Sequence, residues 1–351
     1  MRIAIITDAW RPQVNGVVTT LSRTADTLRE SGHTVTVIHP GEFTTFPCPS
    51  YPEIRLAWRP FRGVRQRLDE FAPEYIHIAT EGPLGLAARR YCTVRGLGFT
   101  TSYHTQFPQY LRARAPIPPG VSYAFLRWFH GAAARIMVAT HQQREELRQQ
   151  GFKHLAAWTR GVDTTLFRPG DPQTIARIID APRPIWIYVG RVAVEKSIED
   201  FLHLDLPGTK YVVGDGPARA RLEPEHPQVC FTGYRFGHEL AALLSAADVF
   251  VFPSRTDTFG VVMLEAMACG LPVAAYPVTG PVDVVNHGVT GFLDHDLRRA
   301  ALQALELDRT ACRQAALACS WETATLQFLG NLEPARSTIH AVAHRARGSA
   351  S

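Results

Sequence analysis

The sequence lacks the long apolar segments that anchor proteins in membranes. Nowhere in its 351 residues does an apolar run approach the roughly 20 residues that span a bilayer. The opening stretch MRIAIITDAW carries a positive charge and a short apolar run, but Asp8 interrupts that run too early for a signal peptide. We therefore expect these residues to form a buried strand, and we expect the protein to be cytoplasmic.

Paired cysteines are also missing. The six cysteines include no CxxC pair, and the two closest, Cys312 and Cys319, have a spacing that matches no metal-ligand pattern. We expect six small, buried thiols in a reducing cytoplasm. The G-x-G-x-x-G fingerprint of dinucleotide-binding folds is absent as well, and the chain contains no internal repeat or low-complexity tract.

Acidic residues are scarce in the first half of the chain. Residues 1–170 contain 21 Lys and Arg against 12 Asp and Glu, a net charge of +9, whereas the remainder contains 16 against 20, a net charge of −4. A basic surface can attract nucleic acid or an anionic membrane. An arginine-rich surface that only contacts water explains the same numbers, so composition leaves these alternatives open.

Short β-rich apolar runs alternate with helical patterns along the chain. Strands are expected at residues 2–7, 34–40, 75–80, 99–104, 135–140, 184–191, 210–216, 229–233, 247–254 and 271–276. Helices are expected at 17–31, 82–95, 141–150, 237–246, 259–269 and 297–306. This alternation is typical of βαβ units and parallel sheets, so the expected fold class is α/β.

The two series of strands predict two doubly wound domains. The stretch FRPGDP at 167–172, with two prolines and a glycine, is the expected join. We expect the first domain at 1–169 and the second at 170–320. A helix at 321–335 is expected to return to the first domain, and the small and polar residues 336–351 are expected to form a disordered tail.

Ligands bind beyond the carboxyl ends of the strands in parallel sheets, and two loops at such ends are candidate anion sites. Asn15 and Gly16 follow the first strand and open a helix, which suits an anion, although an ordinary turn uses the same residues. Arg191 and Lys196 follow a later strand, and two cations in one loop suit a diphosphate. Glu195 could instead pair with either cation on the surface.

A further loop contains two glycines that flank an aspartate. Gly214 and Gly216 end the strand at 210–216. The tight loop that they predict could lie against a flat base or a ribose, and it could equally be a simple turn.

The segment SRTDTFGVVMLEAMACG at 254–270 places two carboxylates eight residues apart. Asp257 is expected at or just before the N-cap of a helix, and Glu265 within that helix. Eight helical residues span roughly 12 Å, about the reach from a hexose across a diphosphate to a ribose. One acid would bind hexose hydroxyls and the other ribose hydroxyls, with the helix N-terminus at the phosphates. A capped helix with a surface acid is the alternative, which the apolar neighbours of Glu265 weaken.

Several segments then occur in a characteristic order. They are R…EK after YVG, then GDGP, FPSRTDTFGVVMLEAMACGLPV and GVTGFL. Together they resemble the family 4 retaining glycosyltransferases with the GT-B fold, over about residues 1–330. DAWRPQVNGVVTTL with SRTDTFG most resembles the branch of GDP-mannose-dependent α-mannosyltransferases, to which the sulfoquinovosyl diacylglycerol synthases are near relatives. The resemblance implies two Rossmann-like domains that face each other across a cleft, with acceptor bound by the first and nucleotide sugar by the second.

The resemblance also implies roles for individual residues. His104, in SYHTQF, matches the histidine beside the reacting sugar, and Arg191 and Lys196 match the pair that binds the diphosphate. Asp257 and Glu265 match the two acids of the family's E-x7-E motif, although Asp257 is one methylene shorter than the usual Glu. The other residues expected to contact the donor are Asn15, Gly16, Gly190, Gly214, Gly216, Thr258, Phe259, Gly260 and Val261.

The family resemblance implies that no metal or other cofactor is needed. Arg191, Lys196 and helix starts can neutralise a diphosphate without Mg²⁺. The segment DHD at 294–296 has the D-x-D spacing of metal-dependent transferases with another fold. It lies far in sequence from the expected phosphate loop, so we interpret these residues as loop acids.

The segment RPFRGVRQRLDEF at 59–71 predicts a basic amphipathic helix. Arg59, Arg62, Arg65 and Arg67 alternate with apolar residues at spacings of three and four. Such helices favour anionic membrane surfaces, and related lipid-glycosylating enzymes have a similar surface, so attachment to the inner face of the plasma membrane is one interpretation. In the other, the apolar face simply packs on the sheet.

The expected activity is therefore transfer of a hexose, mannose from GDP-mannose, to a lipid-linked or glycan hydroxyl with retained configuration. One alternative is a UDP-sugar-dependent glycolipid synthase that transfers a glucosyl, glucuronosyl or sulfoquinovosyl group to diacylglycerol. Others are a nucleotide-sugar epimerase of the same fold and a non-catalytic binder of nucleic acid or membranes. The two acids around an anion site argue against the last two, so we expect no nucleic-acid partner.

Overall fold

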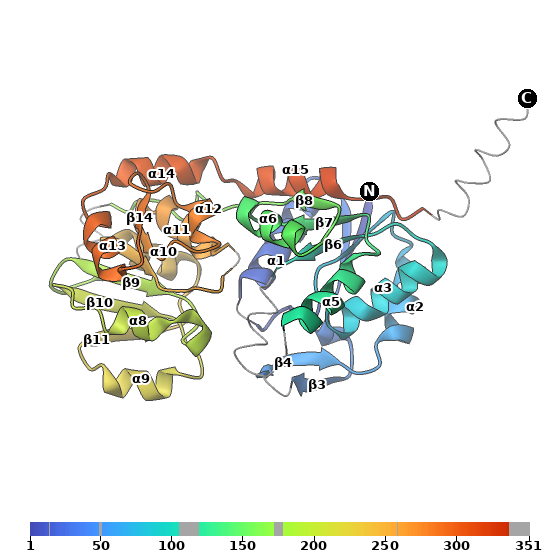
Figure 1. Ribbon diagram of the computed structural model, residues 1–351, viewed down its shortest axis with the longest axis horizontal. Coiled ribbons are helices and arrows are strands. Elements are labelled where there is room, and N and C mark those ends of the chain that lie inside the picture. Colours follow the sequence, from blue (N-terminus) through green and yellow to red (C-terminus); the bar gives the residue numbers. More distant parts are fainter. Residues whose placement is uncertain (14, 49–50, 105–118, 172–177, 258, 337–351) are drawn as a thin grey trace, which may run out of the picture. The chain divides into compact units, whose positions relative to one another are not determined.

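The computed structural model describes residues 1–13, 15–48, 51–104, 119–171, 178–257 and 259–336. The chain forms two compact units (Figure 1). The first unit contains Met1–Thr159 and Ala324–Ser351, and the second unit contains Arg160–Thr323.

The boundary between the two units, at Thr159 and Arg160, precedes the predicted join at 167–172. The reason is that the segment from Val162 to Phe167 is hydrogen-bonded inside the second unit. The Arg313 guanidinium donates to the carbonyl oxygens of Phe167 at 2.7 Å and Thr164 at 3.0 Å. The Val162 amide donates to Cys319 O at 2.9 Å. A Pro- and Gly-rich stretch thus lies inside the second unit, and the sequence signal is displaced from the boundary.

The first unit is built on a six-stranded parallel sheet with the order β2-β1-β5-β6-β7-β8. Its strands are β1 Arg2–Ile6, β2 Thr34–Ile38, β5 Tyr75–Ile78, β6 Thr100–Tyr103, β7 Arg135–Val138 and β8 Leu155–Ala157. Its helices are α1 Gly16–Glu30, α2 Phe61–Phe71, α3 Pro83–Arg95, α5 Pro119–His130, α6 His141–Gln149 and α15 Trp321–Asn331, with a 3-10 turn η1 Pro40–Glu42. An antiparallel pair, β3 Thr45–Cys48 and β4 Tyr51–Ala57, lies outside this sheet.

Both faces of this sheet are buried, because β1 is apolar at consecutive positions. Ile3 and Ile5 pack with Leu21 and Leu28 of α1 and with Phe328 of α15. The alternate residues Ala4 and Ile6 pack on the other face with α2 and α3. Continuous apolar strands of this kind are typical of parallel sheets covered by helices on two sides.

The second unit repeats this architecture with the strand order β11-β10-β9-β12-β13-β14, again all parallel. The strands are β9 Ile185–Val189, β10 Thr209–Val213, β11 Val229–Gly233, β12 Val249–Phe252, β13 Val273–Ala275 and β14 Gly291–Leu293. The helices are α8 Ile198–Leu202, α9 Arg219–Glu225, α10 Gly237–Ala246, α11 Val261–Ala268, α12 Pro281–Val284, α13 Leu297–Ala304 and α14 Arg309–Leu317, with a 3-10 turn η2 Val194–Lys196.

The strand order reverses direction beside β9 in the second unit and beside β1 in the first. β10 and β11 lie on one side of β9, while β12, β13 and β14 lie on the other. Open α/β sheets bind ligands at such switch points, outside the carboxyl ends of the strands. The loops after β9 and β12, and those after β1 and β5, are therefore the places to look for a site.

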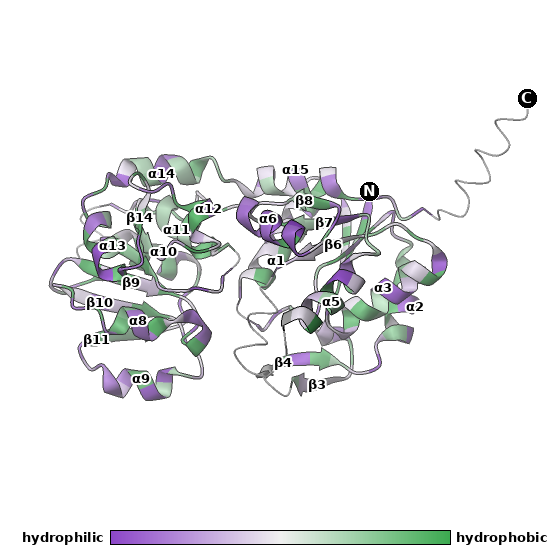
Figure 2. Ribbon diagram, in the orientation of Figure 1, coloured by the Kyte–Doolittle hydropathy of each residue, from purple (hydrophilic) through white to green (hydrophobic). Residues whose placement is uncertain are grey.

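Each predicted strand and helix is present, although most are shorter than predicted. β8 and β14 were not predicted. The surface helices α2 and α13 carry hydrophilic and hydrophobic residues together (Figure 2). Their apolar residues Val64, Leu68, Leu297 and Ala301 are buried. Helix stability in both units therefore comes from packing of one face on a sheet.

Candidate active site

Two loops of the second unit meet at the carboxyl ends of β9 and β12. Lys196 at the end of η2 places its Nζ 2.6 Å from Oδ1 of Asp257, which lies 61 residues later. The Thr256 hydroxyl donates to Glu195 O at 3.0 Å, which fastens the same two loops. The adjacent positions of β9 and β12 in the sheet thus create a contact between two residues that we predicted for one site.

The helix after Asp257 begins later than predicted, and Asp257 does not cap it. α11 begins at Val261, and its N-cap is Gly260, which has no side chain to cap the helix. Gly260 has a φ of 80°, and a Cβ there would lie 2.8 Å from Met263 Cε. The chain therefore enters α11 through a left-handed glycine, and Asp257 faces Lys196 instead. Thr258, which was predicted to contact the donor, lies outside the described residues.

Asp257 is a partly buried acid, and only one of its two carboxylate oxygens is hydrogen-bonded within the described residues. Its side chain is 22% exposed, and among the described residues its Oδ2 is buried and has no hydrogen-bond partner. The buried Tyr188 donates its hydroxyl to Arg191 O at 2.7 Å. Burial, with the negative charges of Asp257 and Glu195, raises the pKa of Tyr188 well above its usual value. A buried carboxylate oxygen beside a cation is suited to accept a hydrogen bond from a ligand hydroxyl.

Gly190, Gly214 and Gly216 have a structural role that was not predicted from the sequence. A Cβ on Gly214 would lie 1.9 Å from Gly190 O, and a Cβ on Gly216 would lie 2.4 Å from Val192 O. The backbone bond from Val192 N to Asp215 O, at 3.0 Å, runs between the same loops. The glycines therefore let the loop after β10 lie directly on the loop that carries Arg191. Their predicted contact with a donor stays a prediction.

Two features that support Asp257 were not predicted. Gly280, after β13, has a φ of 98°, and a Cβ there would lie 2.8 Å from Asp257 O. Arg255 stacks on the Tyr276 ring with Cζ 3.6 Å from its centroid, and the Tyr276 hydroxyl donates to Asp200 Oδ2 at 2.8 Å. Gly280 thus lets the segment after β13 lie directly against the Asp257 carbonyl, and Arg255 holds the segment before Asp257 against Tyr276.

Glu265 lies in the second turn of α11, eight residues after Asp257. It is partly exposed, whereas Leu264 and Ala266 beside it are buried. Phe259 is also buried, at 8% exposure. The apolar neighbours of Glu265 thus face the core and Glu265 does not, so its apolar sequence context is no argument against a surface acid.

In the first unit, Asn15 caps α1. Its Oδ1 accepts hydrogen bonds from Val17 N at 3.1 Å and Val18 N at 3.0 Å. Gly16 has open space around its Cβ position. The side chain therefore occupies two of the backbone N–H groups that the sequence analysis expected to be free for an anion.

Asp8, after β1, is a buried acid whose role was missed. Its carboxylate accepts hydrogen bonds from Leu84 N at 2.9 Å, Gly85 N at 3.3 Å and the Thr80 hydroxyl at 2.9 Å. It thus caps α3 from another part of the chain. Burial raises the pKa of Asp8 to about 6, while the bonds from Leu84, Thr80 and Gly85 act in the opposite direction.

His104 lies directly after β6, where the first unit's site was expected. Its Nε2 is 2.8 Å from Ser102 Oγ, and its ring meets Trp158 edge to face at 5.5 Å. On the other face of β6, the buried His130 bonds Thr101 Oγ1 at 2.9 Å and Glu81 Oε1 at 3.1 Å. His130 was not predicted from the sequence.

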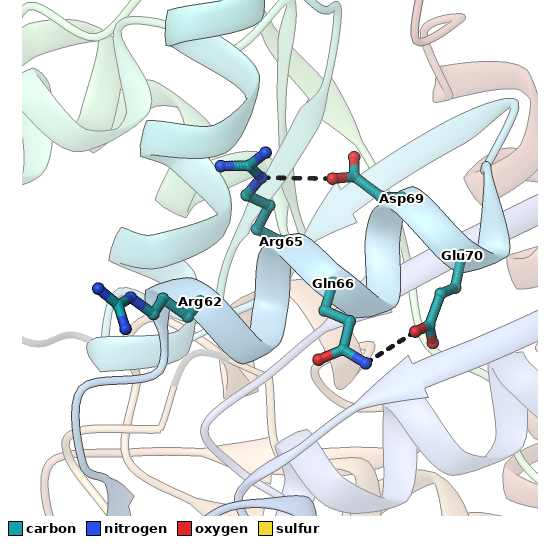
Figure 3. Close-up of a pocket in the computed structure, with 5 residues that line it drawn as sticks. All are labelled: Arg62, Arg65, Gln66, Asp69 and Glu70. Atoms are coloured by element: carbon teal, nitrogen blue, oxygen red, sulfur yellow. Dashed lines mark hydrogen bonds and ion pairs between the residues drawn. The ribbon is translucent and has the colours of Figure 1, made fainter.

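α2, the predicted membrane helix, buries its apolar face. Val64 and Leu68 belong to the core of the first unit. Figure 3 shows Arg62, Arg65, Gln66, Asp69 and Glu70, which line an open hollow of about 420 Å³. Arg65 pairs with Asp69 at 3.4 Å, and Gln66 donates to Glu70 at 2.8 Å.

Two further arginines complete this surface. Arg67 Nε lies 2.5 Å from Glu42 Oε2, and the Arg59 guanidinium lies 5.5 Å from the exposed Trp58 ring. The apolar face of α2 therefore packs on the protein, as the second interpretation held. Only its polar face, with part of its charge paired, is open to a partner.

The acids of the DHD segment have local roles. Asp294 accepts from Arg299 Nε at 2.6 Å, and Asp296 caps α13. No group of three or more His, Cys, Asp or Glu among the described residues could hold a metal ion. No described helix is long and apolar enough to cross a membrane.

Comparison with known proteins identifies the family. A model described as Glycosyltransferase Family 4 matches residues 14–166, and one described as Glycosyl transferases group 1 matches residues 183–307. The chain is 32% identical over 368 residues to the GDP-mannose-dependent alpha-mannosyltransferase of Mycobacterium tuberculosis, covering 96% of this chain and 97% of that protein. The chain belongs to glycosyltransferase family 4.

The names of two other relatives of this glycosyltransferase specify different sugars, mannose in one and sulfoquinovose in the other. It is 30% identical over 325 residues to the GDP-mannose-dependent alpha-mannosyltransferase of Corynebacterium glutamicum, covering 84% of this chain and 76% of that protein. It is 32% identical over 296 residues to the sulfoquinovosyl transferase of Arabidopsis thaliana, covering 76% of this chain and 58% of that protein.

Solved structures define the fold of the glycosyltransferase. Sucrose-phosphate synthase from Thermosynechococcus elongatus is similar with a TM-score of 0.76 and 22% identity, covering 100% of both chains. Anabaena HepE, solved in complex with UDP, has a TM-score of 0.70 and 18% identity, covering 94% of this chain and 99% of that chain. Two units with parallel sheets and these neighbours confirm the predicted α/β class and the GT-B fold.

Proposed function

We propose that this glycosyltransferase moves mannose from GDP-mannose to a lipid-linked or glycan hydroxyl, with retention of configuration. The observation that carries the proposal is the 32% identity, across 96% of the chain, to a protein named GDP-mannose-dependent alpha-mannosyltransferase. The Lys196–Asp257 contact at the carboxyl ends of β9 and β12 supports a donor site in the second unit.

The donor's diphosphate would bind Arg191 and Lys196, which lie in one loop after β9. Their positive charges, with the N-terminus of α11, whose N-cap is a glycine, would stabilise the negative charge that develops on the leaving phosphate. This arrangement needs no metal, and we propose that transfer is metal-independent. Activity that persists in EDTA would support this, and loss restored by Mg²⁺ would contradict it.

The sugar and nucleoside would bind the two acids. Asp257 Oδ2, buried and without a partner among the described residues, would accept hydrogen bonds from hexose hydroxyls. Glu265 would hold the ribose, while the backbone of Phe259, Gly260 and Val261 would face sugar and phosphate. In the first unit, the acceptor would bind near His104, which would donate a hydrogen bond to the transferred sugar.

The acceptor would be presented at an anionic membrane surface, to which the first unit would bind peripherally. Arg62 on the polar side of α2 and Arg59 just before this helix support this attachment, together with the exposed Trp58. We expect Arg59→Glu/Arg62→Glu to abolish flotation with phosphatidylglycerol vesicles and to leave transfer to a soluble glycan acceptor unchanged. Unchanged flotation would contradict the role of this surface.

A donor screen tests the proposal. We expect GDP-mannose and GDP to raise the melting temperature and UDP- or ADP-sugars to leave it unchanged. Protection by UDP-sugars alone would instead favour a glycolipid synthase, an alternative that the similarity to the sulfoquinovosyl transferase keeps in view. Conversion of a donor without any acceptor would indicate an epimerase.

A further inference from the structure

A continuous chain of hydrogen bonds leads from the core of the first unit to His104. Thr100 Oγ1 lies 2.9 Å from His77 Nδ1, His77 Nε2 lies 3.1 Å from Ser102 Oγ, and Ser102 Oγ lies 2.8 Å from His104 Nε2. Thr100, His77 and Ser102 are each 0% exposed. β5 and β6 are parallel neighbours with His77 opposite Thr100, so the register of the sheet builds the chain.

The number of protons on these side chains decides which atom donates and which accepts in each hydrogen bond. Thr100 is buried, and the only hydrogen bond of its hydroxyl among the described residues is to His77 Nδ1. If Nδ1 carried the proton, the Thr100 hydroxyl hydrogen would be buried without an acceptor, which is costly. Thr100 therefore donates, Nδ1 of His77 accepts, and the proton of the neutral His77 ring is on Nε2.

The same reasoning extends to Ser102. His77 Nε2–H donates to Ser102 Oγ, which leaves the single Ser102 proton for another acceptor. His104 Nε2 at 2.8 Å is a better acceptor than Ala79 O at 3.4 Å. His104 then accepts at Nε2 and carries its own proton on Nδ1.

We propose that Thr100, His77 and Ser102 are positioning residues that hold His104 as the neutral Nδ1–H tautomer. That His104 contacts the transferred sugar rests on the proposed function. The tautomer itself rests on the hydrogen bonds within the first unit. The tautomer of a histidine is set by the bond that its other nitrogen makes, and in this chain that bond begins at a buried threonine.

Long-range ¹H–¹⁵N NMR of the full chain, labelled at histidine, tests this directly at neutral pH. We expect a protonated Nδ1 and an unprotonated Nε2 for His104, and the reverse pattern for His77. Assignment uses His104→Gln and His77→Gln. Protonated Nε2 on His104 in the unaltered protein would overturn the proposal, whatever the variants do.

Variants test the hydrogen-bond chain, and one of them is a matched control. Thr100→Val and Ser102→Ala remove a link, and we expect the Nε2–H form of His104 to appear and kcat to fall by about tenfold or more, with the KM for donor unchanged. Thr100→Ser keeps the hydroxyl and should restore both. Thr101→Val removes the hydroxyl bonded to His130 on the opposite face of β6 and should leave the His104 signals unchanged.

The outcomes separate this inference from the proposed function. If no hexosyl donor is turned over but His104 has the Nδ1–H form and loses it in Thr100→Val, the hydrogen-bond chain stands and the function falls. If His104→Ala abolishes transfer while Thr100→Val and Ser102→Ala change neither kcat nor the His104 tautomer, the function stands and the hydrogen-bond chain is wrong.

Discussion

Lys196 and Asp257 form an ion pair, with Nζ 2.6 Å from Oδ1. One carboxylate oxygen contacts the lysine, and the other is buried without a partner among the described residues. In the proposed function, Lys196 would contact the diphosphate and the second oxygen of Asp257 the sugar.

Removing the charge of Asp257 should separate nucleotide binding from transfer. In Asp257→Asn, Lys196 loses its counterion, so we expect GDP to bind at least as tightly as to the unaltered protein. Transfer should fall by about 100-fold or more, because the hexose loses an ionised acceptor. Calorimetry with GDP and a steady-state assay measure the two effects. Weaker GDP binding in Asp257→Asn would contradict the assignment.

Lys196→Ala should act on binding of the diphosphate. We expect the KM for donor and the Kd for GDP to rise by about tenfold or more relative to the unaltered protein. This ratio should be smaller at high salt, because salt already weakens GDP binding by the unaltered protein. Lys153→Ala, at an exposed lysine of the first unit, is the matched control and should change neither constant. If Lys196→Ala binds GDP normally, the donor site does not lie here.

Gly214 and Gly16 should respond in opposite ways to alanine. A Cβ at Gly214 would lie 1.9 Å from Gly190 O, so we expect Gly214→Ala to lower the free energy of unfolding by more than about 2 kcal/mol. Gly16 begins α1 and has open space around it, so Gly16→Ala should leave stability unchanged or raise it by up to about 1 kcal/mol. Denaturant unfolding of both variants measures the contrast, and equal losses would contradict it.

Activity of Gly16→Ala is then informative, because the fold is expected to tolerate it. If the family assignment of Gly16 to the donor site is right, kcat/KM should fall although stability does not. Unchanged kcat/KM would show that Gly16 only begins the helix.

Asp8 should make stability depend on pH in an unusual direction for an acid. Its pKa is raised from 3.8 to about 6, so the folded state holds this proton more tightly than the unfolded state. The contribution of Asp8 to stability is therefore fully present below pH 4 and is lost as the pH rises to about 6, by roughly 3 kcal/mol at 1.36 kcal/mol per pKa unit. Denaturant unfolding between pH 4 and pH 7 measures this change.

Asp8→Asn provides the comparison, because the amide oxygen can still accept from α3 and does not ionise. The stability of Asp8→Asn relative to the unaltered protein should rise between pH 4 and pH 6 and stay level above that. A difference that does not vary with pH would contradict a raised pKa for Asp8.

Much of the fold was predictable because strands buried on both faces leave long apolar runs. β1 and β9 show this in the sequence as RIAII and IWIYV. The boundary at Thr159 was not predictable, since it depends on bonds from Arg313 to Phe167 across 146 residues. The antiparallel pair β3 and β4 has no two-residue turn signal and was missed for that reason.

The site residues were found by motif, but their contacts were not. That Asp257 meets Lys196 follows from the adjacency of β9 and β12, which sequence order does not reveal. Of the residues that alternate along this face, Thr100, Ser102 and His104, only His104 was predicted from the sequence as a site residue. The partner that links them, His77, comes from the neighbouring strand and required the register between β5 and β6.

The most direct test of the proposed activity is product analysis with purified protein, GDP-mannose and either a lipid or an oligomannoside acceptor. We predict acceptor-dependent release of GDP and an α-linked mannose in the product, identified by the NMR coupling of its anomeric carbon and hydrogen. A β-linked product, or turnover of a UDP-sugar but not of GDP-mannose with the same acceptors, would contradict it.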